Sequence, residues 1–164
     1  DTAIENGFSY EAGESTGKKV AVIGGGPAGM AAAYQLRRMG HAATVFEERA
    51  ELGGMMRYGI PGYRIPREKL AAEINRIVDM GVEVKTNTRV GKDISTDQLE
   101  KDFDAVLWAL GCWTGRGLPV DGWDGTSNCV DGLTFLEAFK NGRMKVTGQK
   151  IVWSGGVDTY IDVV

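Results

Sequence analysis

Three glycines and one acidic residue have the spacing of a phosphate-binding turn. Gly24, Gly26 and Gly29 form the pattern G-x-G-x-x-G directly after a short apolar run. In such a turn the first glycine permits a sharp bend and the second lets the backbone approach a pyrophosphate. The third allows a strand and a helix to pack closely. Glu47 follows 23 residues after Gly24, where a carboxylate can accept hydrogen bonds from ribose hydroxyls. These residues predict a dinucleotide site.

The turn alone does not choose between FAD and NAD(P), because both cofactors use this pattern. A helix that begins after Gly26 would offer free N–H groups and a partial positive charge to phosphates. Glu47 disfavours a 2′-phosphate at this site, since two anions would be adjacent.

The elements that must position the turn follow from the local pattern. Residues 19–23 are a β-branched run that predicts a buried strand, 27–39 predict a helix, and 43–47 predict a second strand. This βαβ order implies a parallel sheet. Residues 49–66 hold four glycines and are expected to be an irregular, functional loop.

The rest of the chain alternates between short strands and helices. We expect helices at 66–80, from 95 onward and at 132–140, and strands at 82–86, 89–90, 104–110 and 150–154. The fold class is therefore α/β, a Rossmann-like domain with a parallel sheet and room for a small antiparallel addition. A truncated start of a second Rossmann domain follows it.

Composition excludes several classes of protein. Apolar residues make up 43% and charged residues 25% of the 164-residue chain, and the net charge is −3. The chain has no long basic run of the kind that would indicate binding to nucleic acid. Its longest apolar stretch, 105–113, has about half the length that a membrane-spanning helix needs. Cys112 and Cys129 have no metal-binding spacing and indicate a reduced, cytoplasmic setting.

Beyond the turn, the sequence resembles the small subunit of glutamate synthase and related flavoproteins. The resemblance rests on residues 18–29, on 45–47 and above all on 53–66, GGMMRYGIPGYRIP. It continues through later segments and covers most of residues 18–164. Flavoproteins of this kind include the flavin part of dihydropyrimidine dehydrogenase and bifurcating ferredoxin:NADP oxidoreductases.

The resemblance implies that this domain binds FAD and that an inserted second Rossmann domain binds NAD(P)H. The cofactor-binding residues that it implies are Gly24, Gly25, Gly26, Pro27, Ala28, Gly29, Glu47, Glu48, Gly53, Gly54, Met55, Arg57, Arg64, Val90 and Gly111. For some of them a simpler role stays open. Glu48, Arg57 and Arg64 would otherwise be solvated charges, and Val90 would otherwise be a core residue.

The end of the chain resembles the start of the nicotinamide-binding domain, whose pattern is G-x-G-[ND]-T. The implied contacts there are Gly155, Gly156, Asp158 and Thr159. Val157 stands where the second glycine of that pattern belongs, and its Cβ would crowd a pyrophosphate. We therefore expect nucleotide binding at this second site to be altered or weakened.

The same resemblance divides the chain into three parts. Residues 1–17 resemble the linker after an iron–sulfur domain, 18–128 an FAD-binding domain incomplete at its C-terminal end, and 129–164 the start of the NAD(P)H-binding domain. The chain is thus expected to be a fragment of a longer protein. In that protein, electrons would pass from NAD(P)H through FAD to 4Fe-4S clusters in the missing domain or in a larger catalytic or electron-accepting partner subunit.

We expect no catalytic side chain and no metal site in this chain, because the flavin itself carries such chemistry. Trp108, Trp113 and Cys112 are expected to pack as buried apolar groups. Two other functions stay open. A docking module would keep the fold without the redox role, and an NAD-dependent dehydrogenase would use the first turn for NAD.

Overall fold

A parallel sheet carries the predicted turn at its carboxyl edge. The computed structural model describes residues 2–115, 117, 119–122, 129–144, 150 and 152. In these residues the sheet has the order β3-β2-β1-β4, and every strand pairing in it is parallel. The strands are β1 (Lys19–Ile23), β2 (Ala42–Phe46), β3 (Glu83–Lys85) and β4 (Ala105–Trp108). The predicted α/β class and Rossmann-like parallel sheet are confirmed, and this part of the chain has no antiparallel addition.

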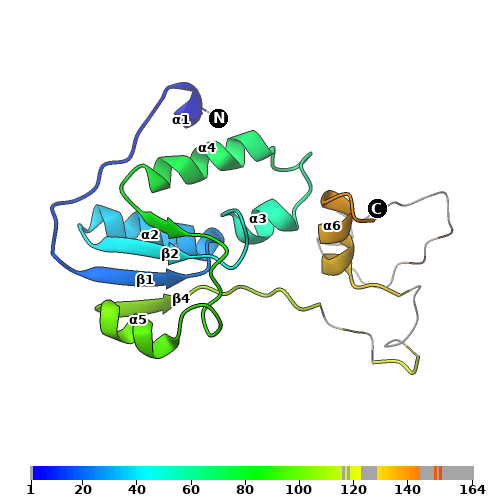
Figure 1. Cartoon of the computed structure of the whole chain (residues 1–164). Helices are drawn as coiled ribbons and strands as arrows, with labels where there is room; N and C mark the ends of the chain where they lie inside the picture. Colours follow the sequence, from blue (N-terminus) through cyan, green and yellow to red (C-terminus); the bar gives the residue numbers. More distant parts are fainter. Residues whose placement is uncertain are drawn as a thin grey trace.

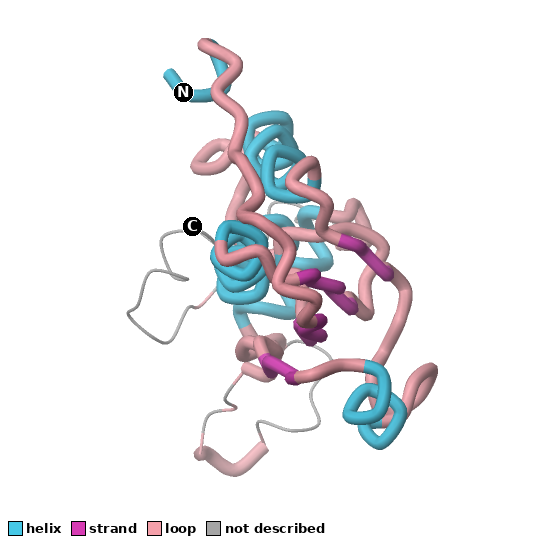
Figure 2. Tube along the Cα trace, turned by 90° about the vertical axis from the view of Figure 1, so that its left-hand side faces the viewer, coloured by secondary structure: helices cyan, strands magenta, loops and turns pink. Residues whose placement is uncertain are grey.

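Helices cover both faces of the sheet. The described helices are α1 (Thr2–Glu5), α2 (Pro27–Arg38), α3 (Gly54–Tyr58), α4 (Arg67–Val78), α5 (Thr96–Asp102) and α6 (Gly132–Lys140). Figure 1 shows α2 and α4 on one face of the sheet and α5 on the other, with α3 and α6 beyond the carboxyl ends of the strands. Figure 2 shows the strands nearly end-on between these layers. In the described part of the chain, no helix combines the length and apolarity needed to cross a bilayer.

The strand β1 is buried on both faces, which explains its unbroken apolar run. Successive side chains of a strand point to opposite faces. On one face Val22 joins a core cluster with residues of α2 and α4, such as Ala33 and Ile74. On the other face Ala21 packs with Leu99 of α5 in a second cluster. The sheet is thus fixed from both sides, and its carboxyl edge is left to the loops.

Most expected elements are present, with three differences. The expected loop at 49–66 contains α3, the expected strand at 89–90 is a single bridge between Val90 and Ile94, and α1 was not expected. The expected strand at 150–154 lies outside the described residues, apart from 150 and 152. The helix expected at 132–140 is confirmed as α6, while the division of the chain at residue 128 stays a prediction.

The segment before β1 lies along the helices. The Nε of Arg76 donates to the carbonyl oxygen of Phe8 over 2.7 Å, and the Arg76 guanidinium lies 4.3 Å from the ring centre of Tyr10. The Tyr10 ring meets Tyr34 of α2 at a centroid distance of 4.7 Å. Residues 8–10, which the sequence assigns to a linker, are therefore attached to α2 and α4.

Candidate dinucleotide site

Two of the three pattern glycines are required by the fold itself. Gly24 has a φ of 109°, in the left-handed region that favours glycine, and a Cβ there would clash with the carbonyl oxygen of Ala109 beyond β4. A Cβ on Gly29, in the first turn of α2, would clash with the carbonyl oxygen of Gly24. The bend after β1 and the close approach of helix and strand are therefore as the pattern predicts.

Gly26 is different, because the protein's own atoms leave room at this position. Its φ of −79° and ψ of −171° are open to any residue. A Cβ there would have its nearest neighbour, the Cα of Gly54, at 3.6 Å, an ordinary contact distance. Gly26 is the N-cap of α2 and provides no side-chain cap, so the N-terminus of this twelve-residue helix is bare. A bare helix N-terminus is suited to binding a phosphate group.

Glu47 is buried directly after β2 and is fixed by the backbone. Only 6% of the residue is exposed. Oε2 accepts a hydrogen bond from the N–H of Gly25 over 2.8 Å, and Oε1 accepts one from the N–H of Arg49 over 2.9 Å. Because a carboxylate has about four acceptor positions, both oxygens keep capacity for a further donor such as a ribose hydroxyl.

Two further glycines, Gly53 and Gly54, pack against the turn at 24–29. Gly53 donates from its N–H to the carbonyl oxygen of Gly25 over 2.8 Å. A Cβ on Gly54 would lie 2.6 Å from the Cα of Gly26, which no side chain tolerates. Both residues have positive φ, 122° and 52°. The start of the 53–66 motif therefore packs backbone against backbone with the turn at 24–29.

Arg57 on α3 is buried, with 8% of the residue exposed. Its Nε donates to the carbonyl oxygen of Leu52 over 2.5 Å, and its Nη1 pairs with Glu51 at 2.9 Å. The alternative of a solvated loop charge is therefore wrong for Arg57, which stabilises the loop that carries Gly53. Arg64 is exposed on the loop between α3 and α4.

The remaining predicted residues are spread around this centre. Pro27 and Ala28 are exposed in the first turn of α2, and Met55 is half-buried on α3. Glu48 is exposed and lies 3.7 Å from Arg89, Val90 packs against the second core cluster, and Gly111 is exposed with a φ of 68°. The residues predicted for the second site, Gly155, Gly156, Asp158 and Thr159, lie outside the described residues together with Val157.

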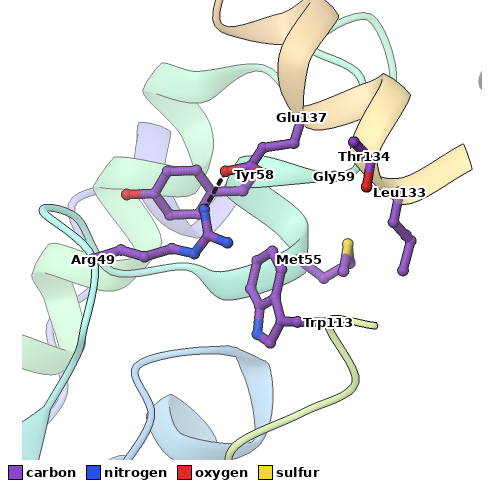
Figure 3. Close-up of a pocket in the computed structure, with 8 residues that line it drawn as sticks. All are labelled: Arg49, Met55, Tyr58, Gly59, Trp113, Leu133, Thr134 and Glu137. Carbon is purple, nitrogen blue, oxygen red and sulfur yellow. Dashed lines mark hydrogen bonds and ion pairs between the residues drawn. The ribbon is translucent and has the colours of Figure 1, made fainter. Parts of the chain in front are cut away.

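Beside the turn, Arg49 forms a cluster that the sequence did not indicate. Its guanidinium lies against the rings of Trp113 and Tyr58, which also contact each other, and it pairs with Glu137 of α6 (Figure 3). Burial raises the pKa of the Tyr58 hydroxyl. Trp113 was expected to be a core residue, but it contacts a charged group instead.

Two further expectations are wrong. Trp108 is 53% exposed, because β4 is the edge of the sheet that the described residues form. Cys112 is exposed as well, and both Cys112 and Cys129 are free thiols. Among the described residues, no group of three or more histidine, cysteine, aspartate or glutamate side chains is arranged to hold a metal ion.

Comparison with known proteins adds a family context to this geometry. Residues 22–73 match a family described as an NAD(P)-binding Rossmann-like domain. The chain is 43% identical over 150 residues to the β subunit of NADP(+)-dependent formate dehydrogenase from Moorella thermoacetica, an alignment that covers 90% of the chain and 21% of that protein. It is 38% identical over 159 residues to the small chain of glutamate synthase [NADPH] from Mycobacterium tuberculosis, covering 90% of the chain and 33% of that protein.

Among solved structures, FprA from Mycobacterium tuberculosis in complex with NADPH superimposes with a TM-score of 0.68 at 20% identity. This match covers 74% of the chain and 28% of FprA, and it supports the fold alone. The chain spans about a fifth of the formate dehydrogenase subunit and about a third of the glutamate synthase small chain.

Proposed function

We propose that this chain, a homologue of the glutamate synthase small subunit and of related NAD(P)-dependent oxidoreductase β subunits, is the FAD-binding part of an NAD(P)H-dependent oxidoreductase. The single observation that carries a nucleotide site at this turn is Gly26, and the choice of FAD follows the resemblance of residues 53–66. The fold requires glycine at 24 and 29, but it leaves ordinary space for a Cβ at 26. Glycine at the bare N-terminus of α2 is explained by a ligand that approaches the backbone.

The residues present fit the ADP half of FAD. The N–H groups at the start of α2 would bind the pyrophosphate, and the buried carboxylate of Glu47 would accept hydrogen bonds from a ribose. Gly53 and Gly54 let the following loop pack backbone against backbone with this turn, where a side chain on Gly54 would clash with Gly26. When bound, FAD supplies the hydride-accepting and electron-donating chemistry, and this chain binds and orients it.

The electron donor and acceptor belong to the full-length protein, by which we mean the longer protein that contains this chain. We propose that NAD(P)H delivers a hydride to the flavin in that protein. Electrons then pass one at a time to iron–sulfur centres and a larger partner subunit, as the glutamate synthase type of enzyme would require. The names of the relatives support this proposal, since they combine NADPH or NADP(+) with glutamate synthase, formate dehydrogenase and Fe(3+) reduction.

A second candidate is NAD(P) binding at the first turn. The description of the family that matches residues 22–73 favours it. Parallel titrations of the full-length protein with FAD, NADH and NADPH, after removal of bound nucleotide, distinguish the two functions. We expect saturable FAD binding that excess NADH does not displace. Displacement of FAD by NADH at the Glu47 site would support the second candidate instead.

A further inference from the structure

The guanidinium of Arg49 lies over two aromatic rings, Tyr58 and Trp113, which also contact each other edge to face with their ring centres 6.2 Å apart. Its central carbon lies 4.0 Å from the ring centre of Trp113 and 4.7 Å from that of Tyr58 (Figure 3). Trp113 follows β4, while Tyr58 is on α3 and Arg49 follows β2. A planar guanidinium stacks on aromatic faces in a way that the ammonium of lysine does not. Three separate segments of the chain therefore meet at this one side chain.

A fourth segment, α6, is attached through the same group. Nη1 of Arg49 lies 2.5 Å from Oε1 of Glu137, and both side chains are about three-quarters buried, at 24% and 29% exposure. Leu136 beside it is 5% exposed, and the Nζ of Lys140 donates to the carbonyl oxygen of Ile60. In the sequence-based division, α6 begins the nicotinamide-binding part. Its contacts place it against α3 and the loop after it.

Arg49 also reaches the candidate site itself. Its backbone N–H donates to Oε1 of Glu47 over 2.9 Å, so one residue contacts the predicted ribose acid with its backbone and α6 with its side chain. The hydrogen bond to Glu47 would survive substitution of the Arg49 side chain by lysine or methionine, because it uses the main-chain N–H. The two connections can therefore be separated by mutation.

We propose that Arg49 is a positioning residue, which fixes α6, the helix assigned to the nicotinamide-binding part, relative to the FAD-binding turn. This inference rests on the proposed function. Hydride transfer requires the reacting atoms to approach to about 3–3.5 Å, and a displacement of about 1 Å can cost about 100-fold in rate. A loosened α6 therefore slows flavin reduction while FAD binding is retained.

The experiment uses four variants of the FAD-loaded full-length protein: Arg49→Lys, Arg49→Met, Glu137→Gln and the double variant Arg49→Met/Glu137→Gln. Arg76→Lys is the matched control. In the wild type, the guanidinium of Arg76 also lies over a tyrosine ring, that of Tyr10, at 4.3 Å, and pairs with Glu73. Arg76, however, contacts the N-terminal segment and not α6. Two quantities are measured, the rate constant of flavin reduction at saturating NAD(P)H and the equilibrium constant of unfolding in urea.

We expect Arg49→Lys and Arg49→Met to reduce flavin about tenfold more slowly than the wild type, with unchanged flavin content and absorbance spectrum. Lysine keeps the charge and still fails, because it loses the stacked plane. The control stays within about twofold of the wild-type rate. The double-mutant cycle compares Arg49→Met, Glu137→Gln and the variant with both substitutions. We expect the unfolding equilibrium constant of the double variant to differ about fivefold from the value that independent effects would give.

Flavin reduction by the Arg49 variants at the control rate overturns the proposal, and so does additivity in the cycle. If the wild-type full-length protein takes up no FAD, the proposed function fails. The cycle then still tests whether Arg49 holds α6 in place, because coupling between Arg49 and Glu137 does not need the cofactor, but the role in flavin reduction falls with the proposed function.

Discussion

Gly25 and Glu47 are joined by a buried hydrogen bond, in which the glycine N–H donates to the carboxylate Oε2 over 2.8 Å. The bond connects the turn after β1 to the residue after β2, so the predicted phosphate-binding and ribose-binding elements form one rigid unit. The carboxylate also accepts from the N–H of Arg49 over 2.9 Å. It is therefore held in place before any ligand binds.

We predict that Glu47→Gln both destabilises the fold and weakens FAD binding. A glutamine amide has one acceptor oxygen for two backbone donors and turns its NH₂ group toward the other donor. An unsatisfied buried polar group costs about 1–3 kcal/mol. We expect this loss of stability in urea unfolding, together with a fall of about tenfold in FAD affinity. Glu48→Gln, at the exposed neighbouring residue, is the control, and equal behaviour of the two variants would contradict the assignment.

Glycine substitutions should separate the fold from the ligand. A Cβ on Gly29 clashes with the backbone of Gly24, so Gly29→Ala should lose about 1–3 kcal/mol of unfolding free energy. Gly26→Ala meets nothing closer than 3.6 Å and should stay within about 0.5 kcal/mol of the wild type. Urea unfolding monitored by circular dichroism measures both. Equal destabilisation by the two substitutions would show that Gly26, too, is required by the fold.

Much of the fold could be predicted from local pattern, because the apolar run of β1, the glycine turn and the period of α2 lie next to each other in the chain. The Arg49 cluster could not be predicted in this way. Glu137 lies 88 residues from Arg49, and stacking of a cation on a ring leaves no periodic signal in the sequence. The exposure of Trp108 was missed for a similar reason, since an apolar run does not reveal that its strand lies at a sheet edge.

Arg57 should stabilise the loop that covers the turn. Substitution by methionine keeps much of the volume but leaves the carbonyl oxygen of Leu52 without its donor and Glu51 without its ion pair. We expect a loss of about 1–3 kcal/mol in urea unfolding and weaker FAD binding, because Gly53 and Gly54 follow Leu52 directly. The control is Arg67→Met, at an exposed position at the start of α4. A stability equal to that of the control would contradict this role.

Asp131 should make α6 sensitive to acid. Burial opposes ionisation, but hydrogen bonds from Thr134 outweigh it and hold the pKa of Asp131 below its usual value. A carboxyl with a lowered folded-state pKa stabilises the fold above its unfolded value of about 3.9 and loses that contribution as the pH falls through the folded value. Asp131→Asn keeps the N-cap acceptor without the titration.

We therefore expect the wild type to lose up to about 1 kcal/mol more than Asp131→Asn between pH 5 and pH 2. Urea unfolding at a series of pH values measures the difference. Parallel stability curves for the two proteins would exclude a titrating cap at Asp131.

The most direct test of the central claim is an FAD titration of the full-length protein and of its Gly26→Ala variant, each first freed of bound nucleotide. Flavin fluorescence reports binding, and urea unfolding confirms that both proteins are folded. We predict saturable binding by the wild type and a loss of at least about tenfold in affinity for a variant of unchanged stability. Equal FAD affinity of the two folded proteins would contradict the claim that the turn at 24–29 is the FAD site.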